Sequence, residues 1–599
     1  NDFSGYARAE LASIKGGETS GEFGAAVGGP IVQDKIGFRL SGWYRRDGGW
    51  IDRASYPGGA LDKNVNTAGS TVLRGAMTFR PTEQLEIVPS FYYQKTTIDD
   101  TAVIWENLSD RGQGRFVSGN QLPEWNRDFF SLGAVAVRYD FGPVALESNT
   151  SLFVRKNASQ WDYTDDIGSI FFGTPYPQLI MAGYQVRATM INRQESFTQE
   201  VRLRTTDPDA RLRWVAGVFY NHADQDSEQW DYDPMFPQMI ETLYGAPVSV
   251  IIGPTARGDQ PYDLVNINRG IDKQLAAFGQ VDFELIDGLI LTAGLRVSKT
   301  KFRSKTDQYG SAIGETHTTG RQEESPITPK VGLSYQINDR NMVYASAAKG
   351  FRLGGSNDPL NPVACGPDFE RLGITANPLS YDADTVWNYE VGSKNTLMDG
   401  RLQIAASAFQ VDWSNIQRDI SLPSCFLGYT TNLGSARSRG FDLEARARPI
   451  DGLTLNAAVG HTSAKYRESF QAVSGAAIVE AGDPLGGPKW VVALGAEYEF
   501  PAFGQNAYVR ADYQYRGRPP AQNPNVTSYD PALYQLKSQE LAKLRIGVRM
   551  DRVDVSLFAD NLFDASPLLA RSHGSRRSPL FLIQTYQPRT IGVTAIARY

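Results

Sequence analysis

Long apolar runs are missing from this chain of 599 residues. No stretch approaches the ~18 consecutive apolar residues that a membrane-spanning helix needs. The formal net charge is only -6 and no block of Lys and Arg occurs, which argues against nucleic acid as a partner. If the protein crosses a membrane, it must do so as a barrel, because only a closed sheet otherwise satisfies every backbone group in lipid.

Signatures of catalysis are equally scarce. The four histidines, His222, His317, His461 and His573, are isolated and lack the spacing of a zinc or other metal site. No G-x-S-x-G nucleophile elbow occurs. The stretch Gly482–Lys489 resembles a phosphate-binding loop only superficially, since a proline stands in the place of its lysine and no helix follows. The sequence therefore predicts that the protein is not an enzyme.

What the chain does contain is glycine, aromatics and a period of two. There are 57 Gly, 28 Tyr and 29 Phe, a mixture typical of turn-rich β structure. Apolar and charged residues alternate strand after strand, as in Phe441–Arg448 and Leu544–Met550. This pattern predicts an all-β, antiparallel transmembrane β-barrel of about 22 strands that occupies residues 1–599 as one domain.

The connections between the expected strands alternate strictly between short and long. Very short turns fall at Gln33-Asp34, Gly142-Pro143, Ile286-Asp287, Asn338-Asp339, Asp399-Gly400, 450–452 and Asp551-Arg552. The long connections between them cover about 49–67, 99–126, 161–192, 229–268, 304–323, 352–384, 418–433, 466–486, 519–540 and 563–587. The order predicts that all long loops emerge at one end, as the extracellular loops of an outer-membrane barrel do. The stretches 144–160 and 212–228 exceed the ~10 residues that cross a bilayer, so we expect them to continue into an extracellular rim.

The last strand is expected to close the ring. In 589–599, Ile591, Val593, Ala595, Ala597 and Tyr599 share one face. Small apolar side chains ending in an aromatic suit a strand with lipid on one side and water on the other. We therefore predict that this strand pairs with the first strand of the chain and that Tyr599 anchors the closure.

Charged residues populate the opposite face of many expected strands and should line the lumen. One interpretation is a water-filled pore in which neighbouring wall charges pair; the other is that these charges grip a separate folded plug. We expect the second, with the following residues facing the plug: Arg8, Glu10, Arg74, Glu200, Arg202, Arg204, Asp282, Glu284, Arg296, Asp442, Glu444, Arg446, Arg448, Glu497, Arg545, Arg549 and Arg598.

Several stretches resemble the barrel of TonB-dependent outer-membrane receptors. They are 196–203 (SFTQEVRL), 344–352 (YASAAKGFR), 388–394 (NYEVGSK), 432–441 (NLGSARSRGF), 558–564 (FADNLFD) and 587–593 (QPRTIGV). The family's usual terminal Phe is Tyr599 here. The resemblance implies a 22-stranded barrel with an N-terminal plug and a TonB-contacting box, neither of which occurs in this sequence, so we expect the plug domain to lie outside this chain.

The resemblance also implies a function and a location. It points to the outer membrane of a Gram-negative cell and to active uptake of a scarce nutrient, by default a ferric siderophore. TonB, acting through the absent plug, outer-membrane lipid and the nutrient ligand would be the partners. The rival interpretation is a barrel that holds a surface lipoprotein or other partner protein and transports nothing. An outer-membrane hydrolase ranks third, since it needs a Ser/His pair near the lipid face.

Aromatic side chains in the long loops are the candidate ligand-binding residues. They could line an extracellular vestibule and stack on a ligand, while an arginine at a loop root could hold an anionic group. Each of them could instead pack the rim or anchor the membrane interface. The candidates are Trp105, Trp125, Trp161, Tyr184, Trp230, Tyr232, Tyr262, Arg352 and Phe426.

Two further sets of residues lie in the expected loops. Cys365 and Cys425 fall in consecutive long loops, and an extracytoplasmic setting predicts that they form a disulfide. The acidic run His222–Asp233 either binds Ca²⁺ or a cationic ligand through its carboxylates or is a solvated loop, and the same alternatives hold for Asp162, Asp165 and Asp166. No other cofactor is expected.

Overall fold

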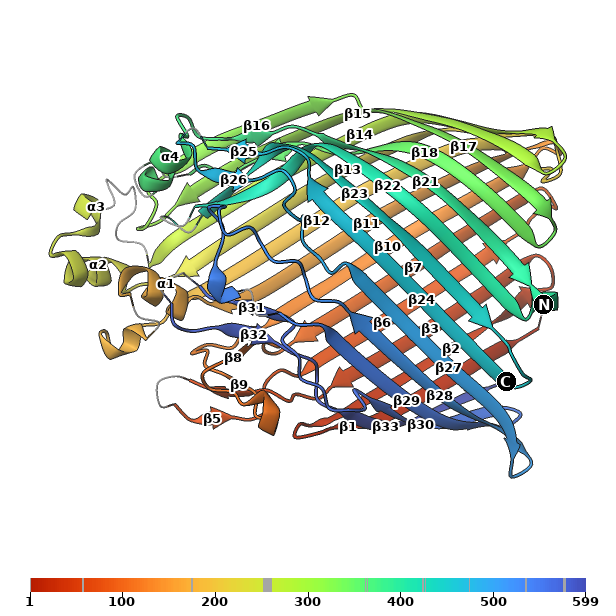
Figure 1. Ribbon diagram of the computed structural model, residues 1–599, viewed down its shortest axis with the longest axis horizontal. Coiled ribbons are helices and arrows are strands. Elements are labelled where there is room, and N and C mark those ends of the chain that lie inside the picture. Colours follow the sequence, from red (N-terminus) through yellow and green to blue (C-terminus); the bar gives the residue numbers. More distant parts are fainter. Residues whose placement is uncertain are drawn as a thin grey trace.

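The chain forms one large closed sheet, seen from the side in Figure 1. The structure is a computed structural model that describes residues 2–55, 59–173, 176–251, 261–360, 362, 365–422, 425, 427–472, 474–533, 536–574 and 578–599. The sheet has 23 segments, and β16 and β17 both pair with β15 because they are two halves of one interrupted strand. The result is a barrel of 22 antiparallel strands, which confirms the predicted fold class.

The barrel strands follow each other round the ring in sequence order. The first eleven are β1 (Ser4–Ile14), β2 (Thr19–Val32), β3 (Ile36–Asp47), β6 (Ala68–Phe79), β7 (Leu85–Ile98), β10 (Asn126–Asp140), β11 (Val144–Asp162), β12 (Arg187–Thr205), β13 (Leu212–Tyr232), β14 (Tyr262–Ile286) and β15 (Leu289–Tyr309). The others are β16 (Thr316–Glu324), β17 (Ile327–Asn338), β18 (Asn341–Arg352), β21 (Asp384–Leu397), β22 (Leu402–Leu422), β23 (Leu427–Ala447), β24 (Leu453–Tyr466), β27 (Trp490–Ala502), β28 (Gln505–Arg516), β29 (Gln539–Arg549), β30 (Val553–Asp560) and β33 (Thr590–Arg598).

Short strands and helices lie in the connections between the barrel strands. The strands are β4 (Asp52–Ala54), β5 (Leu61–Asp62), β8 (Ile104–Trp105), β9 (Val117–Ser118), β19 (Gly355–Ser356), β20 (Ser380–Tyr381), β25 (Phe470–Gln471), β26 (Ala477–Val479), β31 (Ala570–Ser572) and β32 (Leu582–Gln584). The helices are α1 (Thr164–Phe171), α2 (Phe236–Tyr244), α3 (Val248–Ile251), α4 (Gly366–Leu372) and the 3-10 turns η1 (Arg111–Gln113), η2 (Pro177–Leu179), η3 (Met398–Gly400) and η4 (Pro531–Leu533). In the described ranges, none of the helices is long and apolar enough to cross a membrane.

The α-helices of the described residues lie at one end of the barrel, on the left of Figure 1, and both termini lie at the other. The short turns join strands at the terminal end, where Asp34 and Asp399 adopt left-handed φ values of 58° and 54°. Asp tolerates this backbone region better than most residues, which explains its use in tight turns. The predicted sorting of long and short connections is confirmed.

Three stretches expected as loops turn out to be mostly strand. The stretch 418–433 belongs to β22 and β23, which leaves only 423–426 between them. Most of 304–323 belongs to β15 and β16, and the acidic run from His222 to Tyr232 is the end of β13. The ends of β13, β15 and β16 are polar on both faces, which resembles loop sequence, whereas 418–433 has one apolar face with Ile420, Leu422 and Leu433.

The ring closes where the last strand was expected to close it. β33 pairs with β1 over nine residues, from Tyr6 opposite Arg598 to Ile14 opposite Thr590. The backbone of Tyr599 exchanges two hydrogen bonds with that of Gly5, at 3.1 and 3.2 Å. The prediction that Tyr599 stands at the closure is confirmed.

The two faces of the wall differ as the alternation predicted. Leu11 and Leu203 are 61% and 41% exposed on the outer face, where lipid would cover them. On the inner face the charges largely pair along the wall: Glu147 accepts from both Arg202 and Arg204 at 2.7 Å. Similar pairs join Arg8 to Glu10 and Glu22, and Arg549 to Glu497. Neighbouring charges on the inner wall therefore pair with each other, as the interpretation of an open pore expected, while contact of these charges with a plug stays a prediction.

Candidate ligand-binding vestibule

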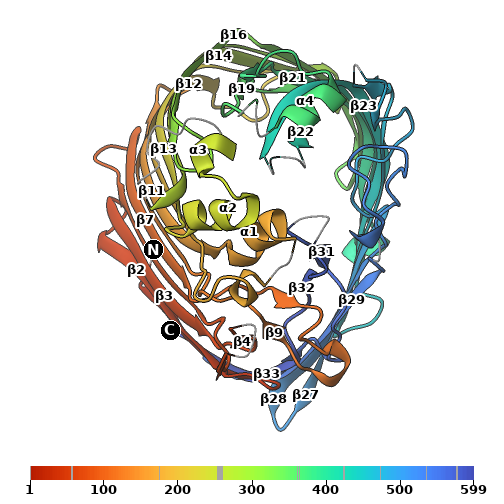
Figure 2. The same ribbon diagram turned by 90° about the vertical axis from the view of Figure 1, so that its left-hand side faces the viewer.

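The end of the β22–β23 hairpin bends into the barrel mouth. The two strands pair regularly up to Ser414 opposite Ser435 and resume at Ile416 opposite Leu433. Asn415 and Gly434 therefore face each other, and both have left-handed φ values, 58° and 43°. Because both strands turn at the same level, the hairpin changes direction there as a unit. Figure 2 shows β22 and the neighbouring α4 turned into the open end of the ring.

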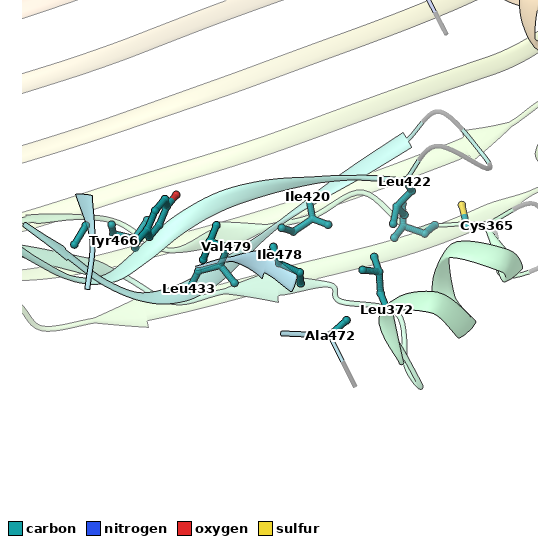
Figure 3. Close-up of a cluster of buried hydrophobic side chains, with 12 residues drawn as sticks. Cys365, Leu372, Ile420, Leu422, Leu433, Tyr466, Ala472, Ile478 and Val479 are labelled. Carbon is teal, nitrogen blue, oxygen red and sulfur yellow. The ribbon is translucent and has the colours of Figure 1, made fainter. Parts of the chain in front are cut away.

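Three connections pack together on this bent hairpin, and we call them the cap: 353–383, 416–433 and 467–489. Their apolar side chains form one buried cluster, seen in Figure 3, in which Leu422, Leu433 and Ile416 are at most 2% exposed. Cys365 and Cys425 form a disulfide across two of the connections, as predicted. Burial of the cluster stabilises the cap as a single body.

Below the cap lies a pocket of about 610 Å³, which we call the vestibule pocket. One side is the inner face of β11–β15, with Arg155, Gln194, Gln225 and Phe302. The other side is the cap, with Asp358 and Asp419. The volume lies in the range of ordinary small-molecule sites.

Hydrogen bonds fasten the cap to the opposite wall. The hydroxyls of Ser304 and Ser356 lie 2.7 Å apart, and Asn266 Nδ2 donates to Asp358 at 2.9 Å. Asn357 then accepts from the backbone N–H of Thr430 at 2.8 Å and links the two cap connections. The vestibule pocket is thus held from both sides.

Two of the predicted ligand-binding aromatics are buried in loop cores. Trp105 is 1% exposed, and its indole N–H donates to Asn120 at 3.1 Å. Tyr184 is fully buried and donates to Asp233 at 2.6 Å. Neither can touch a ligand in this conformation, so their assignment to a binding surface is wrong. An aromatic in a long loop packs that loop when the loop is large enough to have a core of its own.

Three others form a cluster on the outer side of the wall. Trp230 packs edge-on against Tyr262 with ring centres 5.5 Å apart, and Tyr232 does so at 5.8 Å. Trp230 shares a strand face with Val218, which is 53% exposed to the exterior. This cluster therefore faces away from the vestibule pocket, which corrects its predicted place.

The remaining candidates have mixed outcomes. Trp125 and Trp161 line a second pocket of about 390 Å³ at the extracellular end, consistent with a role in binding. Arg352 contacts Asp384 at 2.5 Å and lies over the Trp413 ring, so its charge is already matched. Phe426 lies outside the described residues.

Carboxylates gather where the loops 99–125 and 163–186 meet. Asp162 accepts from the backbone N–H of Leu122 at 3.0 Å, and Asp100 accepts from that of Glu124 at 2.9 Å. Burial, with the nearby carboxylates of Asp162 and Asp100, raises the pKa of Glu124 to about 8. Burial likewise raises the pKa of Asp166 to about 6.

These carboxylates do not make a metal centre. Among the described residues, no group of three or more His, Cys, Asp or Glu side chains is arranged to hold a metal ion. The predicted Ca²⁺ therefore finds no ligand set in this part of the chain and stays a prediction. The hydrogen bonds of Asp100 and Asp162 instead tie neighbouring loops together.

The amide side chains of the vestibule pocket were missed by the sequence reasoning. Asn192, Gln194 and Gln225 line it, and none of the predicted ligand-binding residues that the structure describes does. A signal existed, because the strands expected to rise above the membrane carry uncharged polar residues at alternate positions near their upper ends. Reading those positions by parity would have located the wall of the pocket.

Comparison with known proteins gives a consistent result. Residues 28–562 match the family model described as TonB dependent receptor-like, beta-barrel. The chain is 28% identical over 326 residues to the ferric-pyoverdine M114 receptor PbuA of Pseudomonas sp. (strain M114), covering 51% of this chain and 35% of PbuA. It is 24% identical over 329 residues to the pesticin receptor of Yersinia enterocolitica serotype O:8 / biotype 1B, covering 53% and 43%. The matched regions thus span less than half the length of these relatives.

Solved structures show the same fold. The ferric yersiniabactin uptake receptor FyuA from Yersinia pestis superimposes with a TM-score of 0.77 at 14% identity, covering 100% of this chain and 80% of that one. The siderophore receptor PiuA from Acinetobacter baumannii gives a TM-score of 0.68 at 15% identity, covering 99% and 82%. The matched proteins are receptors rather than enzymes, in agreement with the sequence prediction.

Proposed function

This chain belongs to the family of TonB-dependent receptor β-barrels in the Gram-negative outer membrane, and from that premise we propose that it binds a scarce nutrient at its extracellular end and imports it. The observation that supports this most is the cap bent over a polar pocket of about 610 Å³ at the end that carries the long loops. A mere scaffold needs no enclosed pocket. A ferric siderophore is the proposed nutrient, by analogy with relatives whose names include such ligands.

Import would use energy from TonB transmitted through a plug in the lumen. The inner wall supports this part of the proposal, since Glu444 and Arg446 line a second large recess there, of about 810 Å³. Within the described residues neither makes an ion pair with the wall. Their charges are therefore available to a folded domain inside the barrel.

The test is growth of a deletion strain on single limiting nutrients, with and without the complementing gene. We expect loss of growth on at least one ferric chelate, and the same loss when TonB is deleted. Unchanged growth and unchanged uptake of every nutrient, together with loss of a co-purifying protein, would instead support the scaffold interpretation. Uptake that persists without TonB would contradict the energy coupling alone.

A further inference from the structure

The wall of the vestibule pocket carries a grid of uncharged polar side chains. Strand register places Gln194 opposite Gln225, and Asn192 opposite Ser227. The rows continue on the neighbouring strands, where Asn157 lies opposite Asn192 and Asn268 opposite Ser227. We call these six residues the amide grid: Asn157, Asn192, Gln194, Gln225, Ser227 and Asn268. No register shift interrupts β11–β13 here, so all six share one face.

That face is the inner one. Gln194 lies eight residues from Arg202 along an unbroken strand, and Arg202 donates to Glu147 on the lumen side of the wall. Phe197 and Leu203, at odd positions, are exposed on the outer side. The amide grid is therefore directed into the vestibule pocket rather than towards lipid.

Four of the six grid residues have no side-chain partner among the described residues. Asn192, Gln194, Gln225 and Ser227 make no side-chain hydrogen bond to any described residue. An amide carries two donors and two acceptor positions, and a hydroxyl adds one donor. A cluster of this kind can bind a ligand rich in hydroxyl and carbonyl groups by exchanging water for ligand contacts.

The charges around the grid exclude anions. Three arginines line the pocket, and each has a carboxylate beside it. Asp128 neutralises Arg155 through two bonds of 3.0 and 2.6 Å. Arg193 pairs with Glu228 at 3.3 Å, and Arg269 lies opposite Asp226 in the strand register. Asp358 and Asp419 on the cap bond only to Asn266 and Thr430, so both negative charges stay uncompensated by a described cation. A ligand with several negative charges would meet net repulsion in the pocket.

Building on the proposed function, we infer that the vestibule pocket selects an electroneutral, hydrogen-bonding ligand against an anionic one. Phe302 supplies an apolar platform beside the grid, where Gly270 leaves room for its ring. A neutral trihydroxamate ferric chelate and an uncharged oligosaccharide share the required chemistry. A trianionic triscatecholate ferric chelate lacks it.

The purified full chain can be titrated with these three probes while its tryptophan fluorescence is followed. We expect the neutral chelate to bind at least about tenfold more tightly than the trianionic one. Gln194→Leu with Gln225→Leu should weaken that binding about tenfold, because it removes two unpartnered amides. Asp358→Asn with Asp419→Asn should strengthen binding of the trianionic chelate about tenfold, because it removes the repulsion.

Glu195→Gln is the matched control, since it removes a carboxylate next to Gln194 but on the outer face. It should leave all three affinities unchanged, and retention of the compact barrel in unboiled gel samples shows that each variant folds. Equal binding of the two chelates, or no response to the double Asp→Asn change, overturns the inference, as does binding of none of the probes. Binding of maltoheptaose, the oligosaccharide probe, without binding of either chelate supports the inference and rejects a ferric chelate as the substrate. Loss of uptake in the deletion strain tests the proposed function separately.

Discussion

Opening of the cap should be controlled by the Cys365–Cys425 disulfide. The cysteines are 60 residues apart, and closing a loop of that length with a disulfide stabilises the folded state by about 4 kcal/mol in the chain-entropy description. β21 and the lower part of β22 stay in the barrel when the cap opens, so only about 27 residues of the disulfide loop gain conformational freedom. The stabilisation of the closed cap by the disulfide is then about 3.5 kcal/mol. That free energy corresponds to a roughly 300-fold rise in the open population.

Trypsin cleavage at Arg371 reports this opening, because the residue lies inside α4 and pairs with Asp368 at 2.8 Å. We expect the Cys365→Ser, Cys425→Ser variant to be cut there about two orders of magnitude faster than the oxidised wild type. Reduced wild type should match the variant, and cleavage at Lys537 in a connection outside the cap should not change. A rise below about tenfold would refute the reasoning, since the buried cluster alone would then hold the cap.

Three other outcomes are expected. Asn415→Ala should destabilise the cap by about 1–2 kcal/mol, because it strains a left-handed position and deletes a side-chain bond; Asn415→Gly should cost less, and hydrogen exchange of the hairpin measures both. Arg45→Met leaves the carboxylates of Glu10 and Glu22, both under 10% exposed, with fewer partners; it should lower barrel stability by about 2 kcal/mol in thermal gel-shift assays, whereas Arg45→Lys should cost less. The pKa of Glu124 is raised in the folded state, so its contribution to stability is greatest below the unfolded value of 4.5 and is lost as pH rises towards about 8. Hydrogen exchange in the loop that carries Glu124 should therefore increase between these pH values, and Glu124→Gln should abolish the increase.

The parts of the fold that follow from local rules were predictable. Alternation fixed the strand faces, and turn residues such as Asp34 fixed where hairpins close, because both depend on neighbours along the chain. The closure by Tyr599 was predictable for a similar reason, since a barrel has to pair its first and last strands. Pairing of Cys365 with Cys425 needed only their place in adjacent loops.

The site was not predictable in the same way, because it depends on contacts between distant segments. Whether Trp105 faces a ligand or a loop core is decided by β32, some 480 residues away in sequence. The bend at Asn415 is not located by the sequence either. The apolar positions of β22 do change parity between Ala408 and Phe409, but only the interrupted pairing of Asn415 with Gly434 places the bend. Aromatic content located the extracellular end but not the pocket.

The cap and the amide grid are best understood as one device in which rigidity serves selectivity. A single unpartnered amide contributes little to affinity, because water is nearly as good a partner as the ligand. Several amides held at fixed spacing on a strand face contribute more, since the ligand does not have to order them. The wall is rigid through its ladder of backbone bonds, while the cap needs the disulfide and the buried cluster around Leu422 to reach comparable order. Loosening the cap should therefore reduce discrimination between neutral and anionic ligands before it reduces binding itself, because the charges that repel anions are on the cap and the groups that bind are on the wall.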